Sequence, residues 1–126
     1  MGKGHRDLRV WQLGMDLAEA VYAATASFPA DERFGLAAQM RRAAVSVPAN
    51  IAEGRGRGTD PELLRFCAMA YGSLMELETH VELARRLGYL DEETVASLVY
   101  RASELGRMLN ALRTSVQRPQ APGTGA

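Results

Sequence analysis

The sequence of 126 residues contains one cysteine, few aromatic residues and no long apolar run. With Cys67 as its single cysteine, the chain cannot form an internal disulfide, and the redox compartment stays undetermined. The apolar runs fall well short of the roughly 18 residues that a membrane helix needs, and the first residues have no apolar segment typical of a signal peptide. The sequence therefore predicts a cytoplasmic protein without a membrane segment.

The chain also lacks net charge, because fifteen basic and fifteen acidic residues cancel. This balance argues against a protein coated with positive charge for nucleic-acid binding, although local patches can persist in a neutral chain. Fourteen of the fifteen basic residues are arginine, and Lys3 is the remaining one. Arginine suits phosphate contacts and interface ion pairs, but the base composition of a genome also determines how often it occurs.

The chain is rich in strong helix formers, and its length suits one domain. Apolar residues recur at alternating steps of three and four, which keeps one side of each helix facing its neighbours in near-parallel packing. The sequence predicts an all-α, antiparallel up-down-up-down four-helix bundle over residues 7–118, with flexible tails at 1–6 and 119–126. The expected helices run from Asp7 to Phe28, from Asp31 to the glycines at 54, 56 and 58, from Thr59 to Leu87, and from Asp91 to Val116.

Capping signals mark several of these boundaries. Thr59 and Glu62 have the spacing of a capping box, with a proline inside the first turn. Gly88 followed by Tyr89 predicts a glycine C-cap with an apolar contact behind it. The acidic residues at 91–93 favour a helix start, since acid is stabilised at the positive end of the helix dipole.

The second helix carries an internal proline, Pro48, which removes a backbone hydrogen bond at a cost of about 3 kcal/mol. We therefore expect a kink in this helix. Asn50 lies on its apolar seam, where it either fixes the helix register or donates to the carbonyl of Ala44, or of a neighbour, left without a donor by Pro48. Contact with a ligand or partner is the alternative for Asn50, and the same two interpretations apply to Ser46.

Four arginines flank this segment, Arg41 and Arg42 on one side and Arg55 and Arg57 on the other. The glycines beside the last two would let backbone amides reach a phosphate as well. These arginines are the best candidates in the chain for contact with RNA, DNA or a partner. The alternative is a solvated loop with ordinary interface ion pairs. Glu53 is expected to pair with Arg57 or with an arginine of another subunit.

The first helix has two adjacent apolar stripes, one of which should face the bundle core. The other includes Trp11 and Tyr22. An uncovered stripe of that length would be unusual on a soluble monomer. The sequence therefore predicts a homo-oligomer with Trp11 and Tyr22 as interface candidates.

No group of residues in the sequence points to a reaction. His80 follows Glu76 by four residues, whereas di-iron bundles use Glu-x-x-His pairs with further glutamates. Cys67 lies on the seam of the third helix, where it should be buried and unreactive. The glycines at 54–58 follow a helix rather than a strand, so they do not form a phosphate-binding loop. We expect no enzyme, cofactor, metal or small-molecule substrate; a bundle enzyme that binds a metal or ligand in its interior is the alternative.

Segments over nearly the whole chain resemble one known family. The most specific block is 39–54, with the sequence QMRRAAVSVPANIAEG. The chain resembles the bacterial four-helix bundle proteins encoded by intervening sequences in 23S ribosomal RNA genes. The other matching segments are Val10-Trp11-Gln12, Phe28-Pro29 with Glu32, Phe34-Gly35-Leu36, Ala70 to Ser73, Glu76-Leu77-Glu78, Leu87-Gly88-Tyr89-Leu90 and Met108-Leu109.

This resemblance implies a small bundle that assembles as a homopentamer and has no established catalytic activity. A similar fold serves as the accessory protein of diversity-generating retroelements, which binds its reverse transcriptase and nucleic acid. Those accessory proteins are markedly basic, whereas this chain is neutral. The functions left open are a recognition or scaffold module for nucleic acid or a nucleic-acid enzyme, a reverse-transcriptase accessory protein, and the product of a selfish element with no cellular task.

Overall fold

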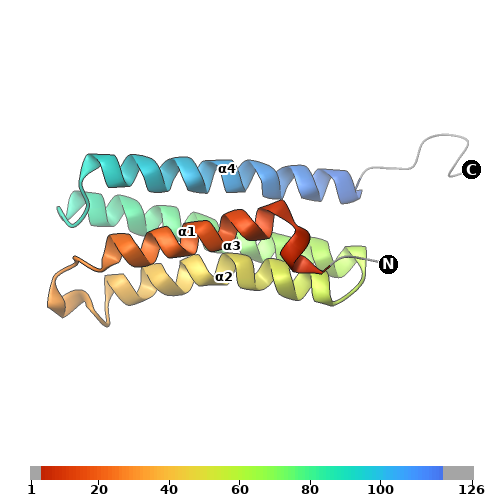
Figure 1. Cartoon of the computed structure of the whole chain (residues 1–126), viewed down its shortest axis with the longest axis horizontal. Coiled ribbons are helices and arrows are strands. Elements are labelled where there is room, and N and C mark those ends of the chain that lie inside the picture. Colours follow the sequence, from red (N-terminus) through yellow and green to blue (C-terminus); the bar gives the residue numbers. More distant parts are fainter. Residues whose placement is uncertain (1–3, 118–126) are drawn as a thin grey trace, which may run out of the picture.

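The computed structural model describes residues 4–117 as four long helices and two short 3-10 helices. Figure 1 shows the long helices side by side, with the chain reversing direction at each turn. Helices α1 and α3 each pack against α2 and α4, and in the described residues neither diagonal pair brings its Cα atoms within 8 Å. The predicted all-α four-helix bundle is confirmed. The elements are η1 (His5–Asp7), α1 (Arg9–Thr25), η2 (Ala30–Glu32), α2 (Leu36–Gly56), α3 (Asp60–Arg86) and α4 (Glu92–Gln117).

The first helix is shorter than the prediction of Asp7 to Phe28. Leu8 has extended backbone angles and separates α1 from the 3-10 turn before it. That turn is folded back on α1, because the side chain of Gln12 donates to the backbone carbonyl of Arg6 at 2.9 Å. Residues 5 and 6, which the sequence assigned to a flexible tail, are therefore helical. The predicted tails at 1–3 and 119–126 lie outside the described residues.

The acidic residues expected to open the second helix belong instead to η2. Glu32 Oε1 accepts from the backbone N–H of Leu36 at 3.0 Å, and its Oε2 accepts from the hydroxyl of Tyr89 at 2.9 Å. The second bond raises the pKa of Tyr89. A Cβ added to Gly35 would lie 2.7 Å from Glu32 Oε1, so a glycine at this position leaves room for the cap. Glu32 thus ties the α1–α2 turn to both α2 and the α3–α4 turn.

Two other boundaries follow the predicted signals. Thr59 Oγ1 accepts from the N–H of Glu62 at 3.4 Å at the start of α3. At its end, Gly88 has a φ of 78°, and the N–H of Tyr89 donates to the carbonyl of Ala84 at 2.9 Å. This is the Schellman arrangement of a glycine C-cap.

The core is formed by the apolar seams of all four helices. Cys67 lies within it and is fully buried, as predicted. Burial raises the pKa of its thiol, which disfavours the nucleophilic thiolate. None of the described helices is long and apolar enough to span a membrane. The largest fully buried side chains include Leu17, Met40, Ile51, Leu74, Leu77, Leu105 and Leu109.

Candidate functional site

Helix α2 continues through its internal proline. It is α-helical without interruption from Leu36 to Gly56, and Pro48 is buried within it. The ring of Pro48 packs against Gly14 of α1, where an added Cβ would lie 3.3 Å from Pro48 Cβ. Close packing against α1 therefore supports the helix where it lacks a backbone hydrogen bond. The kink expected at Pro48 stays a prediction.

Asn50 forms hydrogen bonds within α2 that extend to α3 through Ser46. Its Nδ2 donates to the carbonyl of Ser46 at 2.8 Å and to Ser46 Oγ at 2.9 Å, and Ser46 Oγ lies 2.7 Å from Ser73 Oγ. The prediction that Asn50 satisfies a carbonyl left without a donor by Pro48, such as that of Ala44, is wrong. Its side chain donates to the carbonyl of Ser46, which in an α-helix already faces the N–H of residue 50. Six residues of helix span about 9 Å, so the side chain reaches the residue one turn earlier instead.

We expect Asn50→Leu to lower the free energy of unfolding by about 1 kcal/mol, because the half-buried Ser46–Ser73 pair loses a donor. Urea denaturation measures the change. Asn110→Leu on the exposed side of α4 is the control, with an expected effect within about 0.5 kcal/mol. An Asn50→Leu protein as stable as the wild type, or more stable, would remove this structural role.

The four predicted arginines divide into two pairs near opposite ends of α2, about 20 Å apart. The structure therefore does not gather them into one patch within a subunit. Arg41 is half-buried, and its Nε donates to Thr25 Oγ1 at 2.8 Å. Its guanidinium carbon also lies 4.7 Å from the centre of the Tyr22 ring. These contacts join α2 to α1. Arg42 is exposed and has no ion pair in the described part of the chain.

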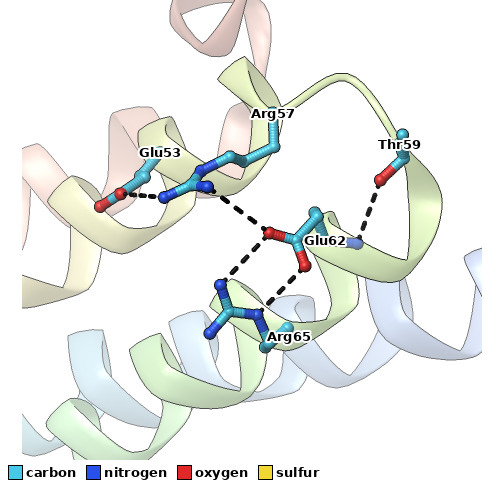
Figure 2. A network of polar contacts seen from close by, with 5 residues as sticks. All are labelled: Glu53, Arg57, Thr59, Glu62 and Arg65. Carbon is cyan, nitrogen blue, oxygen red and sulfur yellow. Dashed lines mark hydrogen bonds and ion pairs between the residues drawn. The ribbon is translucent and has the colours of Figure 1, made fainter.

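Arg57 belongs to a network of charges at the α2–α3 turn, drawn in Figure 2. It lies 2.9 Å from Glu53, as predicted, and 3.8 Å from Glu62, which in turn lies 3.1 Å from Arg65. The hydrogen bonds from Arg65 lower the pKa of Glu62. Two carboxylates thus balance the two guanidinium groups. Arg55 is half-buried and also has an interaction partner. This end of α2 therefore offers little uncompensated charge to a phosphate.

A second group of cationic and aromatic side chains surrounds an open hollow of about 650 Å³ on α1, α2 and the turn between them. Phe34 is 86% exposed and Tyr22 is 47% exposed. The guanidinium carbon of Arg33 lies 5.3 Å from the centre of the Phe34 ring. No acidic residue lines this hollow, which we call the arginine–aromatic hollow. Its lining consists of Tyr22, Arg33, Phe34, Ala38, Arg41, Arg42, Val45 and Ser46.

Sequence reasoning did not single out Arg33 and Phe34 as site residues. The available signal was a large aromatic residue two positions before the start of the second helix at Leu36, outside its apolar seam. Phe34 forms part of a hollow only together with residues of another helix, such as Tyr22 of α1, and sequence spacing does not reveal this contact. Of the predicted arginines, Arg41 and Arg42 line the hollow, and Arg55 and Arg57 do not.

The two predicted interface residues differ in exposure. Trp11 is half-buried, and its ring packs edge-on against His5 with 5.0 Å between ring centres. Tyr22 is exposed and borders a second hollow, of about 410 Å³, together with Met15 and Val45. Met15 and Val45 are 42% and 43% exposed. The exposed apolar surface of α1 therefore continues onto α2, and we call Met15, Tyr22 and Val45 the outer apolar surface.

His80 and Glu76 form one close pair on α3, with 3.7 Å between His80 Nε2 and Glu76 Oε2. His80 is buried, and its Nδ1 has no hydrogen-bond partner. Between residues 4 and 117, no three histidine, cysteine or acidic side chains group closely enough to hold a metal ion. The described residues thus contain no assembled metal centre.

The protein-family model of the 23S rRNA-intervening sequence protein matches residues 6–111. The fold is similar to the crystal structure of a protein of unknown function from the S23 ribosomal protein family of Bacteroides thetaiotaomicron. The TM-score is 0.74 at 20% sequence identity, over 82% of this chain and 97% of that chain. No curated protein matches the chain. The match over residues 6–111 shows that the chain belongs to the 23S rRNA-intervening sequence protein family.

Proposed function

We propose that the chain is a non-catalytic, homo-oligomeric recognition module. The observation that carries this proposal is the outer apolar surface formed by Met15, Tyr22 and Val45. Large contiguous apolar patches are uncommon on soluble monomers, and aromatic residues and methionine are enriched in subunit interfaces. A second copy that covered this surface would remove it from water.

The resemblance to the family gives five as the expected number of subunits. A ring of five requires a heterologous interface, in which the outer apolar surface meets a different surface of the neighbouring subunit. Exposed apolar side chains on α3 and α4 provide candidates for that second surface. They include Met69 of α3 and Val99 of α4.

We expect light scattering on the eluting wild-type protein to give a pentamer mass at micromolar concentration. Met15→Glu should shift the mass towards the monomer, because it places a charge inside the proposed contact. Ala23→Glu is the control, since Ala23 is exposed on the polar side of the same helix. A wild-type protein that elutes as a monomer would end this proposal. Equal masses for Met15→Glu and Ala23→Glu would remove this surface from the interface.

A second candidate function is contact with nucleic acid, favoured by the three arginines of the arginine–aromatic hollow. Because the chain has no net charge, phosphate attraction must come from such a local patch. We expect weak binding at low salt, with dissociation constants of about 10⁻⁴ to 10⁻⁶ M, and little binding at physiological salt. Fluorescence anisotropy with labelled RNA and DNA tests this, and no binding at low salt would exclude it. A role beside a reverse transcriptase is a narrower form of the same candidate.

A further inference from the structure

We infer that the arginine–aromatic hollow binds single-stranded nucleic acid, with a base stacked on Phe34 and phosphates held by Arg33 and Arg42. This inference rests on the second candidate function above and specifies its site and ligand. Of the four predicted arginines, it keeps Arg41 and Arg42 at the hollow and leaves out Arg55 and Arg57. The exposed ring of Phe34, the uncompensated charges and the anchored turn each support it.

The exposed ring of Phe34 provides the stacking surface. Phe34 is 86% exposed, so its ring contributes little to the core of its own subunit. Tyr22 also borders the hollow, but it belongs to the outer apolar surface and Arg41 lies over its ring, so Phe34 is the stacking residue. Every base has a π-face, and exposed aromatic side chains therefore bind unpaired bases with little dependence on sequence. Stacked bases in a duplex hide those faces, which makes single strands the expected ligand.

The arginines provide the positive charge. Among the described residues, Arg33, Arg41 and Arg42 form no ion pair, in contrast to Arg57 and Arg65 at the α2–α3 turn. The polar partner of Arg41 is the neutral hydroxyl of Thr25, which leaves its charge uncompensated. Three positive charges without an acidic neighbour in the lining give the hollow a local attraction for phosphate. Guanidinium groups also stack on bases, as Arg33 and Arg41 already stack on rings.

The backbone on either side of Phe34 is anchored by Glu32. Glu32 holds the preceding turn through its bonds to the N–H of Leu36 and the hydroxyl of Tyr89. Less ordering entropy is lost when a binding residue is held in place in advance. The hollow of about 650 Å³ also lies within the usual size of ligand sites, roughly 300–1,000 Å³. A short unpaired segment therefore fits its dimensions and chemistry.

The test is fluorescence anisotropy of the full chain with a labelled oligouridylate, a single-stranded DNA of equal length and an RNA duplex. We expect the two single strands to bind at low salt and the duplex to bind at least about tenfold more weakly. Phe34→Ala should weaken single-strand binding about tenfold, while Phe34→Tyr retains it. Tyr100→Ala on α4 removes a ring that is 64% exposed and lies outside the hollow, so it should leave single-strand affinity unchanged.

The role of the arginines is tested by measuring how the binding affinity depends on salt concentration. Arg42→Gln should weaken binding by a similar factor for unrelated sequences and reduce the log–log salt slope by about 0.7. Arg107→Gln, at an exposed position of α4, should leave both unchanged. Thermal melts of each variant confirm that it is folded.

Equal binding of duplex and single strand, or wild-type affinity in Phe34→Ala, would overturn the inference. A change in oligomer mass on Phe34→Ala without a change in affinity would show instead that the hollow is a subunit interface. Arg33, Phe34 and Arg42 do not belong to the outer apolar surface, so the assembly proposal and this inference fail separately. A monomeric wild-type protein that bound single strands would end the first and support the second.

Discussion

Gly54→Ala should lower the free energy of unfolding by about 2 kcal/mol, even though alanine is the better helix former. A Cβ at this position would lie 2.7 Å from Phe66 Cβ and 3.3 Å from Leu63 Cα. Helices α2 and α3 would have to separate, because the second of these atoms belongs to the backbone. Overpacking of this kind typically costs about 1–3 kcal/mol, and more in severe cases, which exceeds the gain of roughly 1 kcal/mol in helix propensity.

Gly72→Ala is the matched control for this close packing. Gly72 lies within α3, and an added Cβ would meet no atom within 4 Å. This variant should therefore raise the free energy of unfolding by about 0.5–1 kcal/mol through helix propensity. Urea denaturation of both proteins measures the difference. If the two alanine variants were equally stable, the close approach of α2 and α3 at Gly54 would be contradicted.

Leu74→Ala should cost about 3 kcal/mol, because it leaves a cavity in the middle of the bundle. Leu74 is fully buried on α3, and its Cδ2 lies 3.4 Å from the position of a Cβ added to Gly106 of α4. A domain of this size has a total stability of about 5–15 kcal/mol, so the loss is a large share.

The control for Leu74→Ala is Leu83→Ala on the same helix, where the side chain is 45% exposed. Its expected cost is below about 1 kcal/mol, since much of its surface already contacts water. Chemical denaturation of the two variants measures the loss in free energy of unfolding at a core position and at a surface position. A larger loss for Leu83→Ala than for Leu74→Ala would mean that α3 faces the core with its other side.

The four helices were predictable because each buries one continuous row of apolar residues. The spacing of these residues along the sequence indicates which side of the helix faces the core. On α3, for example, Leu63, Cys67 and Leu74 follow the predicted seam and are all buried. The short 3-10 helices were not predicted, because elements of three residues leave no periodic pattern. Glu32 was assigned to the wrong element for this reason, and its bond to Tyr89 crosses 57 residues of sequence.

The candidate site was predictable only in part. Spacing along one helix correctly paired Glu53 with Arg57, because both lie on adjacent turns of α2. It could not reveal the contact between Arg57 and Glu62 or between Arg41 and Thr25, which depends on how separate elements pack. The sequence therefore predicted the same role for all four arginines. In the structure, acidic side chains balance the charge of Arg57, whereas Arg42 forms no ion pair within the described residues.

The hydrogen bond between Glu32 and Tyr89 couples the motions of two connections that are distant in sequence. The α1–α2 and α3–α4 turns lie at the same end of the bundle, as Figure 1 shows. Opening of either turn must break this bond or carry the other turn with it. We therefore expect these two turns to open as one unit of local unfolding, separately from the α2–α3 turn at the opposite end. Ligand binding beside Phe34 would slow amide exchange around Tyr89 as well, in a segment that the ligand never touches.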